Sequence, residues 1–285
     1  MPASSTFLLR NQPETTHRPE YVNIMNHAIA VFSPNAVLNK NAVRALVAVQ
    51  VAIVILLWIF SPFVLLPKPG EVMSALGELW DQGLGAELLT SFYLNVQAIA
   101  VATVVSLLLA YATVMPFFRP VVALLSKLRF LSLVGLTFFF TVMTRSSHEL
   151  KVSLLVFSVS VFFVTGMADV INGIPKEMFD LARTLRMSEW RVVWEVIVLG
   201  QIDQAFDVLR QNAAIGWMML TMVEGIVRSE GGVGTILLDQ NHHFRLAAVF
   251  AIQLTILMLG LFQDYSIGLF KNMLCPYAAL TLERN

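Results

Sequence analysis

The chain has 285 residues, of which 57% are hydrophobic and only 13% charged, and its formal net charge is zero. Soluble domains carry about 25% charged residues. A mean hydropathy of +0.72 leaves more apolar surface than a chain of this length can bury, so we expect a bilayer as its solvent. The zero net charge argues against a nucleic-acid partner. Cys275 is the only cysteine, which excludes an intrachain disulfide and a thiolate metal cluster.

The first forty residues are mostly polar and contain four prolines. They lack the basic region, short apolar core and cleavage site of a secretory signal peptide. We therefore expect residues 1–41 to form a cytoplasmic N-terminal extension.

Six stretches are apolar over the roughly 20 residues that a helix needs to cross a bilayer. They cover residues 42–66, 92–114, 121–142, 152–170, 202–227 and 246–270. The third begins weakly, near Lys127 and Arg129. The fifth opens with Asp203, Asp207 and Arg210, so its first turns should lie outside the hydrocarbon. The predicted fold is an all-α polytopic membrane protein with about six transmembrane helices.

The basic residues predict the orientation. With the N-terminus inside, all but five of the 19 Lys and Arg residues fall on cytoplasmic segments or helix ends, as expected from the excess of positive charge on cytoplasmic loops. The five exceptions are Lys68, Arg145, Lys151, Arg228 and Arg245. We place both termini, including a tail at 278–285, in the cytoplasm, and the chain in the cell inner (plasma) membrane.

Two connections between spans are informative. Residues 66–72, Leu-Pro-Lys-Pro-Gly-Glu-Val, must leave the first helix. Val72, Ala75, Leu76 and Leu79 then recur at helical spacing, which predicts a short helix on the outer interface. Residues 42–91 thus hold the first span and this helix, and residues 92–277 hold a permease core.

The longest polar insertion covers about residues 172–200, on the cytoplasmic side, and its pattern predicts two short amphipathic helices. Pro175 suits a first helical turn. Ser188 is placed as an N-cap, with Glu189 in the favourable first turn.

This insertion carries a motif. It reads Gly173-Ile174-Pro175-Lys176-Glu177-Met178-Phe179-Asp180-Leu181-Ala182-Arg183-Thr184-Leu185, followed by Ser188-Glu189-Trp190. The run resembles the cytoplasmic "EAA" loop of binding-protein-dependent ABC importer permeases, in particular the nitrate/sulfonate/taurine branch. Further matches in the same order are the Pro67–Val72 run, Trp217, Glu224, the Gly231-Gly232-Val233-Gly234 run, Asp264 and Pro276-Tyr277. The resemblance covers roughly residues 50–277.

The resemblance implies a type I ABC importer permease. Such a chain works with a second permease subunit, often identical, two ATPase subunits that hold ATP and Mg, and an extracytoplasmic binding protein. It would be no enzyme and carry no cofactor itself. The substrate in this branch is commonly a small anion such as nitrate, a sulfonate (taurine) or bicarbonate.

By the same resemblance, one helix of the loop docks on the ATPase. Phe179, Ala182 and Leu185 are expected to form the apolar docking face, and Asp180, Arg183 and Arg186 to set its register by charge. A rigid docked helix passes force better than a flexible loop. The alternative from the residues alone is a plain polar connection between spans.

The loop departs from the family pattern at three places. Asp180-Leu181-Ala182 replaces Glu-Ala-Ala, Arg186 stands where a turn glycine belongs, and Gly200 stands where a proline belongs. Glycine accepts positive φ at no steric cost, whereas arginine does not. Either the turn takes another shape, or the loop meets a divergent ATPase, or the chain is a paralogue that does not transport.

Several other residues have more than one interpretation. Gly231-Gly232-Val233-Gly234-Thr235 lacks the ending of a phosphate loop and predicts a turn or broken helix. His242-His243 with Asp239 favours a solvated outer pair over a metal site. Glu224 and Asp264, acids in or near spans, are assigned a structural or gating role, with substrate contact left open.

Asn95, Gln97 and Thr221 are candidates for a weakly polar path, although polar groups in spans more often tie helices together. Two alternatives to the importer remain. A secondary transporter or channel would need no ATPase, and a divergent membrane scaffold would not transport.

Overall fold

The computed structural model describes residues 39–63 and 65–276, and over these residues every regular element is helical. The chain divides into two compact units, residues 1–62 and 63–285. The first contains α2 (Lys40–Ile59), a helix rich in valine, isoleucine, leucine and alanine without a charged residue after Arg44. The predicted extension at 1–41, apart from its last three residues, and the tail at 278–285 lie outside the described residues.

The second unit begins with α3 (Pro69–Asp81), where the sequence predicted a short helix. Glu71 accepts a hydrogen bond from the backbone N–H of Lys68 at 3.1 Å, which satisfies one free donor at the helix start. Val72 and Leu79 are buried, as the apolar spacing indicated. The two residues lie seven apart, two helical turns, and so share the face that packs on the rest of the unit.

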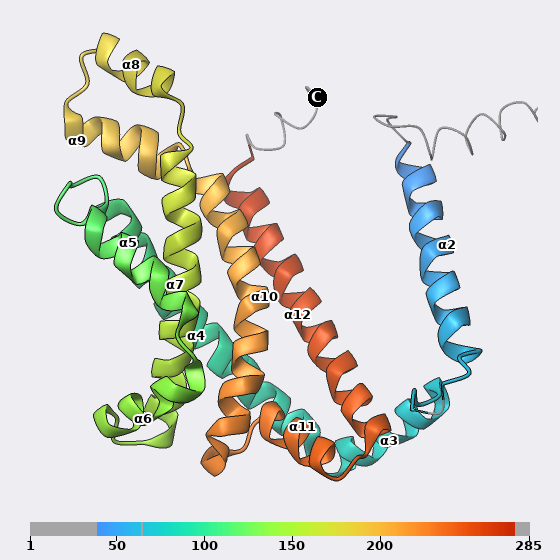
Figure 1. The fold of residues 1–285 in the computed structure, drawn as a ribbon. Helices are drawn as coiled ribbons and strands as arrows, with labels where there is room; N and C mark the ends of the chain where they lie inside the picture. Colours follow the sequence, from blue (N-terminus) through green and yellow to red (C-terminus); the bar gives the residue numbers. More distant parts are fainter. Residues whose placement is uncertain (1–38, 64, 277–285) are drawn as a thin grey trace, which may run out of the picture. The chain divides into compact units, whose positions relative to one another are not determined.

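The long helices of the second unit are α4 (Leu84–Ala112), α7 (Ser147–Asn172), α10 (Ile202–Ile226) and α12 (Leu246–Leu274). Figure 1 shows α10 running beside α12, with α7 on its other side. The shorter elements are α8 (Lys176–Thr184), α9 (Glu189–Val192), a π-helix (Val193–Leu199) and α11 (Val233–His242). In Figure 1, α8 and α9 lie at one end of this unit and α11 at the other.

The core lies where α4, α7 and α10 meet. Ala110 of α4, Phe163 and Met167 of α7, and Val208 of α10 form one buried cluster. Gly166 lets α7 and α10 approach closely, because a Cβ there would lie 3.1 Å from Val208 Cγ1. Small residues at helix contacts allow the close packing on which helix association in membranes depends.

Four helices are long and apolar enough to cross a membrane, namely α2, α4, α7 and α12. The third predicted span, 121–142, is not one helix. It is broken into α5 (Arg119–Lys127), a 3₁₀ turn (Leu128–Phe130) and α6 (Leu133–Met143), and this pair is bent by 115°. The charged pair Lys127 and Arg129 marks the break. If the bent pair is one span, the number of candidate spans is five.

The fifth predicted span corresponds to α10, which follows the predicted 202–227 within one residue. It does not join the four apolar helices, because Asp203, Asp207 and Arg210 lie in its first three turns and Glu224 near its end. Two predicted starts were also late: α4 begins eight residues before 92, and α7 five before 152.

Candidate functional site

The insertion at 172–200 folds into a small unit with a core of its own. α8 and α9 turn back on each other and lead through the π-helix into α10 (Figure 1). The buried side chains of this core come from both helices, the π-helix and the start of the loop: Ile174, Ala182, Val192, Val196 and Ile197. Phe179 packs against them while half-buried. The segment is therefore more than a polar connection.

α8 has two apolar faces, and the sequence reasoning merged them. Ala182 is only 4% exposed and, with Phe179, faces the loop's own core. Leu185 is 62% exposed and shares the outer face with Leu181 and Met178, at helical spacings of three and four. The docking face predicted from Phe179, Ala182 and Leu185 is thus corrected: Leu185 alone of the three is exposed. The exposed apolar stripe is Met178, Leu181 and Leu185.

Five charged residues of the loop pair with one another. Arg183 lies 3.5 Å from Asp180 and 4.0 Å from Glu189, and Arg191 lies 3.9 Å from Glu195. All are well exposed, so each pair stabilises the loop by less than about 1 kcal/mol. Ser188 occupies the N-cap position of α9, as predicted, although its side chain makes no cap hydrogen bond.

The turn after α8 takes the left-handed shape that favours glycine, with Arg186 in that position at φ 54°. The Met187 N–H donates to the Ala182 carbonyl at 3.2 Å, and the Arg186 N–H donates to that of Arg183 at 2.9 Å. These two bonds form a Schellman motif. The turn thus keeps the usual shape despite the arginine, which settles one of the alternatives that the sequence left open.

Gly200, the other departure, has an ordinary φ of −68°. Glycine is required at this position because a side chain does not fit: a Cβ there would lie 2.5 Å from the Val196 carbonyl oxygen. The π-helix brings that carbonyl close at the point where the loop enters α10. π-Helical segments often occur at functional sites.

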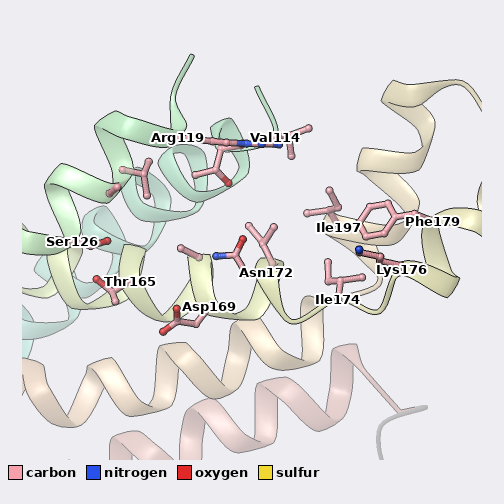
Figure 2. Close-up of a pocket in the computed structure, with 15 residues that line it drawn as sticks. Val114, Arg119, Ser126, Thr165, Asp169, Asn172, Ile174, Lys176, Phe179 and Ile197 are labelled. Atoms are coloured by element: carbon pink, nitrogen blue, oxygen red, sulfur yellow. The ribbon is translucent and has the colours of Figure 1, made fainter. Parts of the chain in front are cut away.

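A cavity of about 760 Å³ lies beside the loop (Figure 2). Its walls come from α5, the end of α7, and α8. Arg119, Asp169, Asn172 and Lys176 supply charged and polar groups, while Ile174, Phe179 and Ile197 supply apolar ones. The cavity lies between α5 and the loop.

The opposite end of the unit holds a buried polar cluster around the glycine turn at 231–234. Glu224 of α10 is 1% exposed. It accepts hydrogen bonds from the Ser91 hydroxyl at 2.6 Å and the Gly234 N–H at 2.8 Å. Ser91 Oγ in turn accepts one from the Val233 N–H at 2.9 Å. The run at 231–235 was predicted as a turn or broken helix after the fifth span, and the structure has a turn there, between the end of α10 and the start of α11 at Val233.

Two further charged residues complete this polar cluster, which we define as Glu87, Ser91, Lys151 and Glu224. Glu87 accepts a hydrogen bond from the Gly232 N–H at 2.6 Å, and buried Lys151 donates to the Gly231 carbonyl at 2.9 Å. Sequence reasoning missed both. The available signal was Lys151 itself, a charge near the start of a long apolar run. The cluster ties α4, α7 and α10 to the turn, which is a structural role for Glu224.

The three residues proposed to line a polar path differ in their surroundings. Asn95 is buried and donates to Gln263 Oε1 at 3.0 Å, which also accepts from Trp217 Nε1 at 2.8 Å. Asn95 thus ties α4 to α12. Gln97 is half-buried, with a buried Oε1. Thr221 donates to the Met218 carbonyl at 2.9 Å and lines a cavity of about 420 Å³ between α10 and α11.

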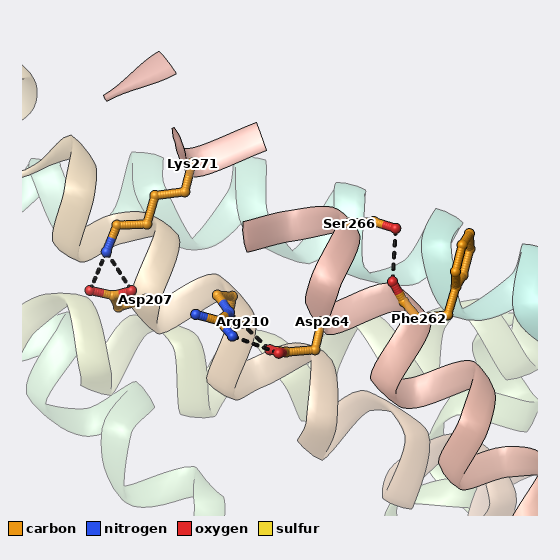
Figure 3. Close-up of polar contacts among 6 residues, drawn as sticks. All are labelled: Asp207, Arg210, Phe262, Asp264, Ser266 and Lys271. Atoms are coloured by element: carbon orange, nitrogen blue, oxygen red, sulfur yellow. Dashed lines mark hydrogen bonds and ion pairs between the residues drawn. The ribbon is translucent and has the colours of Figure 1, made fainter. Parts of the chain in front are cut away.

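Asp264 is paired across two helices (Figure 3). Arg210 of α10 donates to its two carboxylate oxygens, at 2.9 and 2.5 Å. A second pair joins the same helices, because Lys271 Nζ of α12 lies 2.6 Å from both carboxylate oxygens of Asp207. We call these four residues the charged seam. The sequence singled out Asp264 but gave no indication of its partner 54 residues away.

Comparison with known proteins identifies the fold. No protein-family model matches the chain, and no curated protein matches it. Among solved structures, a chain from the crystal structure of an amino acid ABC transporter with histidines is similar, with a TM-score of 0.55 and 17% sequence identity. The match covers 70% of this chain and 97% of that one. The chain therefore has a helical fold shared with a chain of an ABC transporter.

Proposed function

We propose that the chain is the membrane-spanning subunit of an ABC importer and that loop 172–200 couples it to a separate ATPase. The observation that carries the proposal is the loop's own apolar core combined with an exposed apolar stripe, Met178, Leu181 and Leu185. A loop that served only to connect two spans would need neither. The fold shared with an ABC transporter chain supports the same function.

The geometry suggests how force passes through the loop. The outer stripe of α8 contacts the ATPase, and the inner face of α8 rests on Val192, Val196 and Ile197. The π-helix that carries two of these residues continues directly into α10. A push on α8 is thus transmitted through packed side chains to the start of a long helix, as rigid-body coupling requires.

The remaining features of the proposal follow from the sequence resemblance. The loop and both termini lie in the cytoplasm of a cell with this chain in its inner membrane. The ATPase subunits hold ATP and Mg, a second permease subunit completes the path, and an extracytoplasmic protein delivers the substrate. The substrate is a small anion such as nitrate, a sulfonate or bicarbonate. On the loop, Asp180, Arg183 and Arg186 set the register against the ATPase.

The test is recovery of an ATPase subunit with the detergent-solubilised chain. We expect Leu181→Asp to reduce recovery at least 10-fold, because it puts a charge in the centre of the apolar stripe. Lys176→Asp is the matched control. Lys176 is also exposed and lies in α8, but it is five residues before Leu181 and so on the other side of the helix, and recovery should stay within about 2-fold of the parent chain.

Two outcomes would count against the proposal. If the parent chain recovers no ATPase under mild conditions, the coupling function is wrong. If both variants reduce recovery equally, the stripe is not the contact surface. Recovery of ATP-dependent uptake in vesicles would distinguish an importer from a scaffold.

A further inference from the structure

One face of α10 is polar over its first three turns. Gln204, Asp207 and Gln211 are all exposed, and their spacings of three and four residues put them on one side of the helix. Ala214 and Met218 continue the same exposed side. The polar part of this side is distinct from the side of α10 that packs on α7 through Val208 and from the side on which Trp217 bonds to Gln263.

The charged seam borders this face. Arg210 and Asp264 keep 39% and 44% of their side-chain surfaces exposed while bonded to each other. The second pair, Asp207 with Lys271, is likewise open on the Asp207 side. Figure 3 shows both pairs bridging α10 and α12 along their length.

The depth of the seam follows from helix lengths. α12 has 29 residues, about 43 Å at 1.5 Å per residue, so it exceeds a hydrocarbon core of roughly 30 Å by about 6 Å at each end. Asp264 lies ten residues from its C-terminal end, about 15 Å. With α12 centred in the bilayer, this places the Arg210–Asp264 pair about 8 Å inside the hydrocarbon, deeper than the sequence predicted for the first turns of α10, and Lys271 at the boundary. The same calculation from the start of α10 gives a similar depth for Arg210.

A half-exposed ion pair at that depth cannot face lipid without a large cost, and such residues generally face protein or a water-filled cavity. The apolar exposed residues of α12 show what a lipid-facing surface looks like in this chain: Leu257, Met258, Leu261, Phe262, Leu269 and Phe270. On the polar face of α10, by contrast, the exposed residues of the first three turns, Gln204, Asp207 and Gln211, are all polar or charged.

We propose that Gln204, Gln211 and the charged seam line a water-filled path through the inner half of the membrane. The proposal rests on the transport function proposed above and specifies where the path runs. Its wall carries two positive and two negative groups, so it opposes neither sign of solute. Selection then depends on the Arg210–Asp264 pair, in which a solute oxyanion competes with Asp264 for the guanidinium fork and a solute cation competes for the carboxylate.

Thiol labelling tests the path directly, because Cys275 is the only native cysteine. In a Cys275→Ser background, reconstituted in lipid nanodiscs, Gln211→Cys is compared with Phe262→Cys on the apolar face. The probes are two membrane-impermeant methanethiosulfonates, one anionic and one cationic. We expect Gln211→Cys to react at least 10-fold faster than Phe262→Cys with both reagents.

Charge variants test the role of the seam. Adding Arg210→Gln should raise the cationic-to-anionic rate ratio at position 211 by about 3-fold or more, and Asp264→Asn should lower it by a similar factor. The double variant, again balanced in charge, should return the ratio to that of the parent and shows that the chain still folds.

Each other result overturns the proposal. Equal, slow reaction at positions 211 and 262 would place the seam in lipid. Slow reaction combined with oxidative disulfide formation between two copies at position 211 would place it at a subunit contact. If neither charge variant changed the cationic-to-anionic rate ratio at position 211, selection by the Arg210–Asp264 pair would be excluded. The experiment uses the chain alone, so its outcome is independent of whether an ATPase is recovered.

Discussion

At one end of the helical unit, the glycine turn at 231–234 is held by hydrogen bonds from three long helices, and the Glu224 and Lys151 side chains that bond it are buried. At the other end, loop 172–200 is held by five buried apolar side chains, with its charges on the surface. A buried polar network tolerates few geometries, because each unpaired group costs about 1–3 kcal/mol. A small apolar core has no such directional requirement. The first end is suited to a fixed frame and the second to a part that moves as a unit.

The largest effect is expected at the fixed end, for Gly232→Ala. Gly232 has φ +105°, and a Cβ there would lie 2.8 Å from Glu224 Oε2, so the variant combines backbone strain with displacement of a buried carboxylate. We expect a loss of about 3–5 kcal/mol in unfolding free energy. Thermal unfolding in detergent is read from the reaction of buried Cys275 with a thiol-reactive fluorophore.

Gly77→Ala is the control for this variant. Gly77 lies inside α3 with no atom near the position of a new Cβ, so alanine should leave stability unchanged or raise it by up to about 1 kcal/mol. If Gly232→Ala unfolds at the same temperature as Gly77→Ala, the turn is not the rigid feature that the comparison requires.

The second effect concerns the loop core. Ala182→Arg forces a long charged side chain into a space filled by Val192, Val196 and Ile197, and we expect it to unfold the loop at a cost of about 2–4 kcal/mol. Leu181→Arg, one residue earlier and 58% exposed, should leave the loop folded. Hydrogen exchange of the amides at 176–199 distinguishes them, and equal protection in the two variants would contradict the assignment of faces.

Much of the fold could be predicted because apolar length is a strong signal in a membrane protein. The apolar run at 246–270 was sufficient to predict α12. The breaker cluster at 66–72, with the helical spacing of the apolar residues after it, was sufficient to predict α3. The break between α5 and α6 was not predicted, because apolar composition continues through it and the 115° bend depends on tertiary packing. Lys127 and Arg129 were the local sign of the break.

The candidate site was less predictable, for two physical reasons. A helix with apolar residues on both sides, as in α8, does not itself indicate which side its neighbours cover, and Phe179, Ala182 and Leu185 were therefore grouped together. Polar residues in spans do not name their partners either. Glu224 and Asp264 were recognised as unusual, whereas Ser91 and Arg210, 133 and 54 residues away, could be found only in three dimensions.

The smallest expected effect is a gain in stability, for Arg186→Gly. An L-residue in the left-handed region costs about 1–2 kcal/mol of folded-state stability, which glycine would recover. Glycine also gives the unfolded chain more conformational freedom, which offsets roughly 0.5–1 kcal/mol of that gain. We expect the loop to gain about 0.5–1 kcal/mol, seen as slower exchange of the Met187 amide that bonds to Ala182. Arg191→Gly removes the same exposed side chain from inside α9 and should act in the opposite direction, by up to about 1 kcal/mol.

Measuring how much ATPase is recovered with Arg186→Gly shows whether the Arg186 side chain also contacts the ATPase. A loop that gains stability and keeps its ATPase shows that the arginine is tolerated strain. A loop that gains stability but loses its ATPase shows that the guanidinium belongs to the contact, and that the chain retains a strained turn because its partner requires a charge there. No gain in protection would mean that the Arg186 side chain makes interactions that offset its backbone strain.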